Sequence, residues 1–191
     1  MKLQSVATVG MALGMTVLCG CAGKHGHQQH QQDSLLEVPQ TTASLRVPEG
    51  QILTLVVKAT GVQIYECGVD KGDDTKMMWN FKAPEAELFD THGKLKGQKI
   101  GKHYGGPTWE GNDGSKVVGH VRASENSPDP SAISWLRLSA ESNSGSGIFA
   151  KTVSIQRLGT NGGKPPADGC DSAHAGTQVR VPYTAQYYFY N

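Results

Sequence analysis

The sequence predicts an all-β domain, an antiparallel β-sandwich or open β-barrel with few or no helices. Two patterns predict it: short stretches in which apolar residues alternate with polar ones, and clusters of Gly, Pro, Asn and Asp between them. No window of a dozen residues carries a clean helical stripe, and the 24 glycines and 9 prolines indicate many turns. We expect roughly eight to ten strands in one domain over residues 45–191.

The predicted strands follow one another at short intervals. A tight turn is expected at Thr60-Gly61, between the first two strands, and a hairpin turn at Asn112-Asp113-Gly114, whose residues accept positive φ. Pro84–Phe89 fits either a helical turn that starts at proline or a strand. The expected strands are Ile52–Ala59, Val62–Cys67, Met77–Ala83, Lys116–Ser124, Ile133–Ala140, Ile148–Leu158 and Ala185–Tyr190.

The first twenty residues have the layout of an export signal. Lys2 precedes an uncharged, mostly apolar run to Leu18 that is too short to span a bilayer as a mature helix. The run closes on Leu18-Cys19-Gly20-Cys21, which resembles the lipobox of bacterial lipoproteins. We expect cleavage before Cys21 and acylation of Cys21. The alternative is an ordinary secretory signal that contains cysteine, although such signals favour a small residue where Leu18 stands.

Acylation of Cys21 predicts a membrane-anchored protein of the cell envelope. The following residue, Ala22, is not the aspartate that retains many lipoproteins at the inner membrane. By that resemblance we expect the outer membrane, with the domain facing the periplasm or the cell surface.

Residues 22–44 read as a polar, Gln-rich, flexible tether. A metal-binding tract and a solvated spacer are both compatible with its three histidines, and the spacer is favoured because no carboxylate or thiol cluster joins them. These histidines are His25, His27 and His30.

The charge of the mature chain is balanced. Without the signal, 171 residues remain, with 17 basic and 17 acidic side chains. Bulk charge therefore does not favour nucleic acid or anionic lipid headgroups as partners.

Two cysteines remain in the domain, Cys67 and Cys170. An even pair in an exported chain predicts a disulfide, which in the chain-entropy model contributes about 4 to 5 kcal/mol for a loop of about 100 residues. Two buried thiols are one alternative. A metal pair is another, but it lacks nearby ligand spacing.

The densest polar and aromatic stretch runs from His103 to Asp113. Its glycines let a ligand approach the backbone, Trp109 has a flat ring, and His103 and Glu110 can exchange protons. This mixture suits a sugar or another small polar ligand. The alternative is that Trp109 belongs to the core and the polar groups cap turns. The candidate ligand-binding residues are His103, Tyr104, Trp109, Glu110 and Asp113.

A weaker candidate site lies next to Cys170. Asp171 and His174 are three residues apart and are a possible metal pair with a histidine from elsewhere, but aspartates in loops more often make local turns. No cofactor is expected.

Five separate strings resemble a known family: GVQIYECG (61–68), WNFKAPEAELFD (79–90), HYGGPTWEGNDGSKVVG (103–119), ISWLRLSA (133–140) and VSIQRLGTNGGKPPADGC (153–170). The family is domain of unknown function 3455, found in bacterial exported proteins and fungal secreted proteins. The resemblance runs from about Leu45 to Asn191. It implies an exported domain without an established activity, and no catalytic residue carries over.

Some fungal relatives bear the automatic label malate dehydrogenase. The one dinucleotide-like string here is Gly145–Ala150, formally G-x-G-x-x-A. A true fingerprint opens a helix within a βαβ unit, whereas the β-patterned TVSIQRL follows this string. We therefore predict a glycine-rich hairpin turn and reject nicotinamide chemistry.

Two functions are compatible with these features. The first is a binding or structural module that recognises a small polar molecule or a polysaccharide through the His103–Asp113 region. The second is a secreted hydrolase or metal-assisted enzyme. It would use His103, Glu110, Asp171 and His174, and requires that these side chains converge in one cleft.

Overall fold

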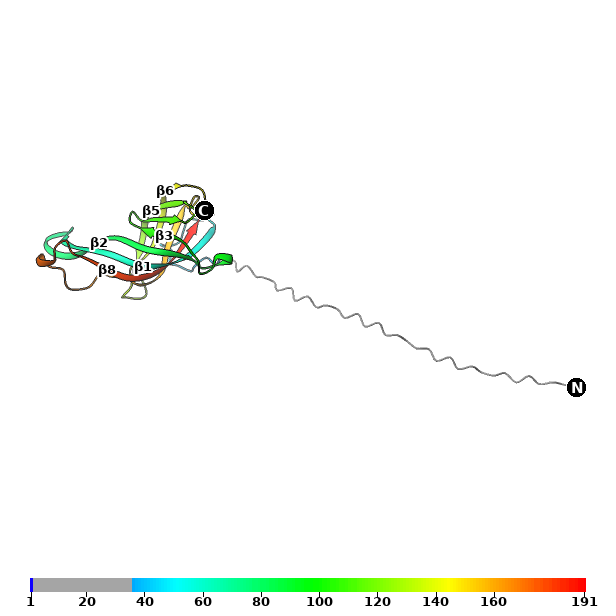
Figure 1. Ribbon diagram of the computed structural model, residues 1–191, viewed down its shortest axis with the longest axis horizontal. Coiled ribbons are helices and arrows are strands. Elements are labelled where there is room, and N and C mark those ends of the chain that lie inside the picture. Colours follow the sequence, from blue (N-terminus) through cyan, green and yellow to red (C-terminus); the bar gives the residue numbers. More distant parts are fainter. Residues whose placement is uncertain (2–35) are drawn as a thin grey trace. The chain divides into compact units, whose positions relative to one another are not determined.

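Eight strands form one antiparallel sheet in the computed structural model, which describes Met1 and residues 36–191. The strands pair in sequence order and β1 also pairs with β8, so the sheet closes into a barrel (Figure 1). The predicted all-β, antiparallel class is confirmed, and closure leaves the barrel without an open edge. The strands are β1 (Leu53–Asp70), β2 (Asp73–Asp90), β3 (Lys99–Tyr104), β4 (Thr108–Gly111), β5 (Lys116–Glu125), β6 (Trp135–Ser144), β7 (Ser154–Gly162) and β8 (Gln178–Tyr190).

The first strand is longer than the sequence pattern indicates. The predicted tight turn at Thr60-Gly61 is wrong, because β1 runs through both residues and stays paired with β2 and β8. Gly61 serves another purpose: a Cβ there would lie 2.1 Å from the carbonyl oxygen of Glu85. The glycine therefore permits a close approach of two strands rather than a reversal of the chain.

Two other predicted turns are confirmed. Asn112-Asp113-Gly114 connects β4 to β5, with Gly114 at a φ of 81°. Gly145–Ala150 lies in the connection from β6 to β7, and a strand follows it. Pro84–Phe89, for which helix and strand were both open, is strand within β2. The helical elements in the described residues are two 3-10 turns, η1 (Gly93–Leu95) and η2 (Ser172–His174).

Alternation along β8 builds much of the core. Tyr183, Ala185, Tyr187 and Phe189 point into the barrel and are at most 3% exposed. Phe149, from the connection before β7, packs on Phe189 with ring centroids 4.8 Å apart. The rest of this cluster comes from all around the barrel and includes Val57, Leu88, Val117, Leu138 and Ile155.

Residues ahead of β1 cover part of the outside of the barrel. Leu45 is fully buried, and its carbonyl accepts a hydrogen bond of 2.7 Å from Gln156 of β7. The Thr42 hydroxyl donates to Glu125 at 2.7 Å. Residues 36–44, the part of the predicted tether that the structure describes, therefore lie against the barrel.

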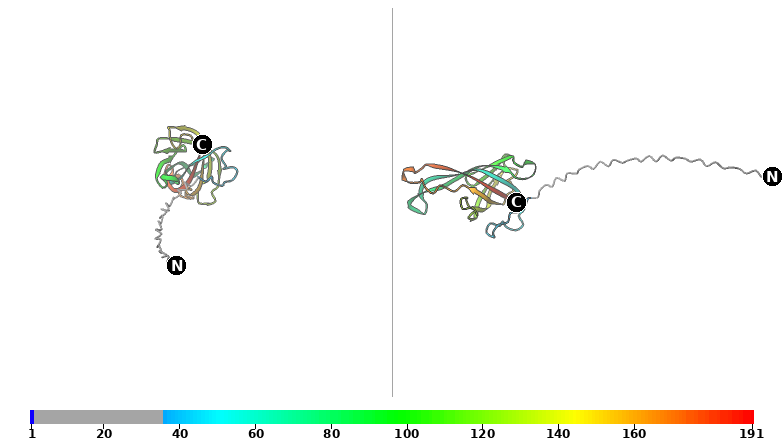
Figure 2. Two further views of the ribbon diagram at one scale, coloured as in Figure 1. Left: turned by 90° about the vertical axis from the view of Figure 1, so that its right-hand side faces the viewer. Right: turned by 90° about the horizontal axis from the view of Figure 1, so that it is seen from below.

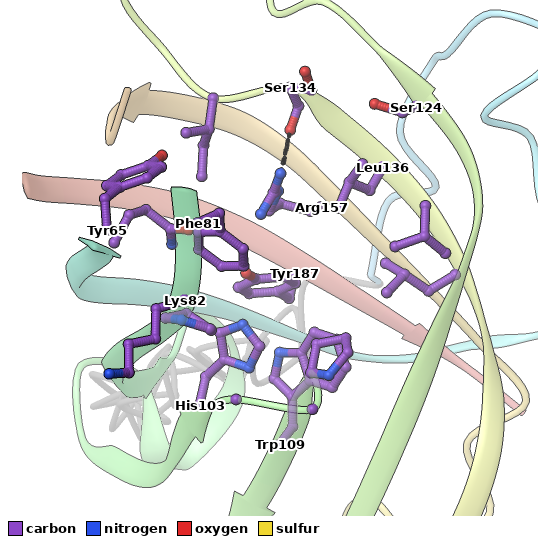
Figure 3. Close-up of a pocket in the computed structure, with 18 of the residues that line it drawn as sticks. Tyr65, Phe81, Lys82, His103, Trp109, Ser124, Ser134, Leu136, Arg157 and Tyr187 are labelled. Carbon is purple, nitrogen blue, oxygen red and sulfur yellow. Dashed lines mark hydrogen bonds between the residues drawn. The ribbon is translucent and has the colours of Figure 1, made fainter. Parts of the chain in front are cut away.

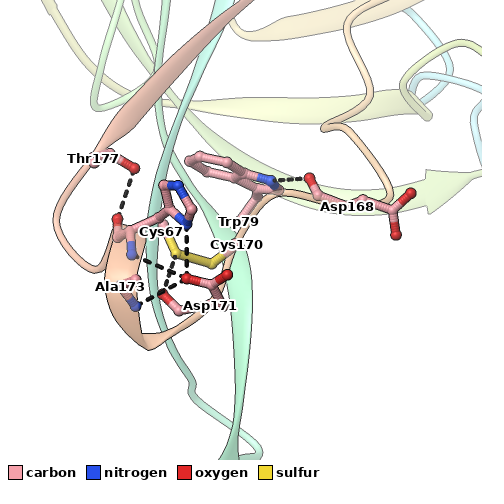
Figure 4. A network of polar contacts seen from close by, with 8 residues as sticks. Cys67, Trp79, Asp168, Cys170, Asp171, Ala173 and Thr177 are labelled. Atoms are coloured by element: carbon pink, nitrogen blue, oxygen red, sulfur yellow. Dashed lines mark hydrogen bonds and ion pairs between the residues drawn. A yellow bond between two sulfur atoms is a disulfide. The ribbon is translucent and has the colours of Figure 1, made fainter.

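The ends of β1, β2 and β8 extend beyond the other strands (Figures 1 and 2). A disulfide joins Cys67 of β1 to Cys170, 103 residues later, in the loop before β8, which confirms the predicted pairing. Trp79 of β2 packs beside it, and its indole nitrogen donates to the carbonyl of Asp168 at 3.0 Å (Figure 4). The disulfide and this hydrogen bond tie the long loop after β7 to the extended strands.

The predicted signal peptide (residues 1–20), Cys21, and the histidines His25, His27 and His30 lie outside the described residues. Within the described part of the chain, no helix is long and apolar enough to cross a membrane.

Candidate functional site

A pocket of about 440 Å³ opens into the barrel interior (Figure 3). All eight strands contribute side chains to its wall. Its volume falls in the usual range for small-molecule sites, which are mostly apolar with a few polar groups. Five of its lining residues carry aromatic rings: Tyr65, Phe81, His103, Trp109 and Tyr187.

His103 and Trp109 form the floor of the pocket. They face each other across the β3–β4 pair, and their rings stack with centroids 4.4 Å apart at an angle of 12°. Tyr187 packs edge-on against both rings, at 5.1 Å and 5.2 Å. Because Trp109 is only 1% exposed, it belongs to the core and lines the pocket at the same time.

Gly119 of β5 makes room for this floor. A Cβ at that position would lie 2.9 Å from the indole ring of Trp109. A larger residue would displace the ring, so the shape of the floor depends on a glycine in a neighbouring strand.

His103 is held neutral. Burial lowers the pKa of its ring from 6.5 to about 3, and the hydrogen bond to Thr108 opposes this only in part. In that bond Nδ1 donates to the Thr108 carbonyl at 2.8 Å, so Nε2 carries no proton. His103 therefore gives the pocket an aromatic surface and a hydrogen-bond acceptor, but no positive charge, and its pKa does not suit proton exchange near pH 7.

Three buried donors around the pocket lack well-placed partners. Gln63 Nε2, Trp109 Nε1 and the Tyr187 hydroxyl form no hydrogen bond of good geometry within the described residues, and all three side chains are at most 2% exposed. Gln63 lies near the Tyr183 hydroxyl, and Tyr187 lies near Tyr183 and Arg157. An unpartnered buried polar group costs about 1–3 kcal/mol, and native proteins hold few of them. Three of the seven such side chains in the described residues line this one pocket, and they give it hydrogen-bonding capacity.

Tyr104 and Glu110, two further candidates from the sequence, do not line the pocket. They alternate with His103 and Trp109 along β3 and β4 and so lie on the outer face. The Tyr104 hydroxyl donates to Glu110 at 2.6 Å, and this bond, followed by the one from Lys116, lowers the pKa of the Glu110 carboxyl. The pair belongs to a charged network on the barrel surface.

Asp113 also stands apart from the pocket and connects two loops. Its carboxylate accepts backbone hydrogen bonds of 2.9 Å from Ser115 and from Ile148. Its role is structural, the alternative that the sequence left open.

The weaker candidate pair lies beside the disulfide (Figure 4). Asp171 caps η2 by accepting from the backbone of Ala173 and His174, and its carboxylate lies 2.7 Å from His174 Nδ1. The contact with His174 is the main cause that lowers the pKa of Asp171. Within the described residues, no group of three His, Cys, Asp or Glu side chains is arranged to hold a metal ion.

The four residues of the enzyme alternative are not brought together. His103 lies inside the barrel, Glu110 lies on its outer face, and Asp171 and His174 are exposed in the loop before β8. No observation in the described structure favours a catalytic arrangement of these side chains.

Most pocket residues were not singled out as binding candidates from the sequence, among them Gln63, Arg157 and Tyr187. Gln63 and Arg157 look like ordinary polar residues of half-buried strands, and Tyr187 like a packing residue. Only the pairing register of the strands could have identified them. Arg157 pairs with Tyr187, and both side chains point inward once β7 and β8 are adjacent.

Fold and pocket together define a small all-β barrel with an interior, aromatic-lined site of ligand size. The chain belongs to the family described as protein of unknown function (DUF3455), whose sequence model matches residues 48–191. No curated protein and no solved structure matches the chain.

Proposed function

We propose that this chain is a lipid-anchored protein of the cell envelope whose barrel binds one small molecule in its interior pocket. The observation that carries the binding role is the pocket itself, which combines a ring-lined wall with the unpartnered donors of Gln63, Trp109 and Tyr187. The lipobox-like Leu18–Cys21 and the N-terminal apolar run support the anchor.

The pocket favours a small molecule over a polysaccharide. A stacking platform for a long glycan needs a ring open to solvent, whereas Trp109 is 1% exposed at the bottom of the pocket. The exposed ring at the mouth, Phe81, is 54% exposed and packs edge-on against Tyr65.

A neutral fluorescent probe tests this proposal. N-phenyl-1-naphthylamine should bind the purified protein saturably, at one site, with increased fluorescence. Val121→Trp narrows the pocket at a position that is 45% exposed, so it should lower affinity at least about tenfold while the fold is kept.

Val153→Trp is the matched control. Val153 is similarly exposed, at 43%, but lies outside the pocket, so this variant should bind like the wild type. No saturable binding by the wild type, or equal affinities of the two variants, would refute an interior site.

A further inference from the structure

Arg157 places a positive charge inside the barrel. It lies on β7, directly across from Tyr187 of β8 and from Leu136 of β6, and it lines the pocket. Its Nε and one terminal nitrogen donate to the Ser134 carbonyl at 3.1 Å and 2.8 Å (Figure 3). This carbonyl fixes the guanidinium plane but supplies no negative charge.

No carboxylate of the described residues forms an ion pair with Arg157. By contrast, Lys82 of β2, which also lines the pocket, pairs with Glu66 at 2.6 Å. The lining includes Lys82, Arg157 and Lys164 but no aspartate or glutamate. The whole chain is close to neutral, so this imbalance is local. A half-buried charge without a counter-ion is unfavourable, and an anion in the pocket would compensate it.

The groups around Arg157 suit an oxyanion. The Tyr187 hydroxyl, in a side chain that is 1% exposed, makes no hydrogen bond of good geometry in the described residues. Tyr183 and Arg157 lie near its oxygen as donors, which leaves its own proton for an acceptor. Arg157 lowers the pKa of this hydroxyl, although burial has the larger effect and raises it. Guanidinium and hydroxyl donors on adjacent strands match the two oxygens of a carboxylate.

We propose that the pocket selects an organic carboxylate with an apolar body. Its carboxylate binds Arg157 and the Tyr187 hydroxyl, and its body lies against the rings of Phe81 and His103. This inference rests on the proposed function, since it assigns a ligand class to the same pocket. The neutral state of His103 is consistent with it, because the floor then presents a ring to the apolar body rather than a second cation.

Matched compounds of nearly equal size test the charge directly. Naphthalene-2-carboxylate is ionised at pH 7, above the carboxyl pKa of about 4, whereas naphthalene-2-carboxamide is neutral. Titration calorimetry on the purified wild-type protein should show the carboxylate binding at least about tenfold more tightly than the amide, a difference of about 1.4 kcal/mol. This ratio needs no variant and therefore does not depend on a mutant that folds.

Two variants test which lining cation causes the preference for the carboxylate over the amide. Arg157→Gln keeps an amide that can donate to the Ser134 carbonyl but removes the charge, so it should bring the ratio of the two affinities close to one. Lys164→Gln removes an exposed cation from the rim and should keep the ratio near the wild-type value. Thermal unfolding of each variant checks that the barrel is intact.

The outcomes separate the ligand class from binding itself. If wild-type protein binds carboxylate and amide equally, or if Lys164→Gln removes the preference and Arg157→Gln keeps it, the assignment to Arg157 is wrong while the pocket remains a binding site. If neither compound binds and the neutral naphthylamine also fails, the proposed function is itself overturned.

Discussion

Trp109 shows how one side chain can serve the core and the pocket. One face of its indole packs with the stacked ring of His103, and Phe189 meets it edge-on at 5.9 Å. Truncating a buried tryptophan costs about 3–5 kcal/mol, so loss of binding in Trp109→Ala would not separate the two roles. Val121 and Arg157 are less buried than Trp109, so substitutions there test binding with less effect on the core.

His103 makes stability depend on pH in the acid range. In the unfolded chain the ring takes up a proton near its usual pKa of 6.5, but in the folded chain only near about 3. Between these values the unfolded state binds more protons, so stability falls as the pH falls, by about 1.4 kcal/mol per pH unit from this group. We expect His103→Asn, which keeps a donor for the Thr108 carbonyl, to unfold with a shallower pH dependence between pH 6 and 4.

Urea denaturation at several pH values measures that slope. His120→Asn is the control, because His120 is exposed on β5 and its replacement should leave the slope unchanged. Equal slopes for the wild type and His103→Asn would contradict the burial of a neutral ring.

Of the candidate residues that the sequence singled out, only some line the pocket, and the division follows from strand geometry. His103 and Trp109 line the pocket, whereas Tyr104 and Glu110 do not, because neighbours in a strand face opposite sides. A candidate stretch taken as one block therefore mixes inner and outer residues. Arg157 could not be found this way, since its place depends on pairing with β8, about thirty residues further along the chain.

At the scale of elements, the sequence predicted class and alternation better than strand length. The burial of Gln63, Tyr65 and Cys67 on one face of β1 follows from a period of two. The same pattern misplaced a turn at Thr60-Gly61, because glycine in a strand can mark close packing as well as reversal. The residues around Gly61 do not show whether it marks a turn or a close approach of strands, because the atom that requires a glycine there, the Glu85 carbonyl oxygen, belongs to β2.

The extended ends of β1, β2 and β8 depend on the disulfide. Only a few side chains pack there, around Tyr65, Cys67 and Trp79, away from the main core. We expect the double variant Cys67→Ser/Cys170→Ser to lose about 4–5 kcal/mol of unfolding free energy on the chain-entropy model, with amide exchange rising first in Gln178–Thr184.

A reducing agent supplies the control for this prediction. Complete reduction should lower the melting temperature of the wild type toward that of the double variant, and should leave the variant itself unchanged. A melting temperature that does not respond to verified reduction would show that the bond contributes little.

For the whole molecule, closure of the sheet creates the interior in which we propose that the ligand binds. The pairing of β1 with β8 leaves the barrel itself without an open edge. Beyond the barrel, β2 before Glu85 and β8 before Tyr183 are paired with β1 alone. Eight strands give an interior wide enough for packed side chains plus one small ligand. The sequence predicted most of the strands, though not β3. It did not predict the closure, because the first and last strands meet only in the folded chain.

The proposed lipid anchor concerns the whole chain, and its test is at Cys21. If Cys21 is acylated, full-length protein expressed in a bacterial host should enter the detergent phase of a Triton X-114 separation, and Cys21→Ala should move nearly all of it to the aqueous phase. Cys19→Ala is the matched control: Cys19 lies before the predicted cut, so its loss should not change the partition. Retention of Cys21→Ala in the detergent phase would rule out this residue as the anchor. An aqueous wild type whose mass matches the cleaved, unmodified chain would identify an ordinary secreted protein instead.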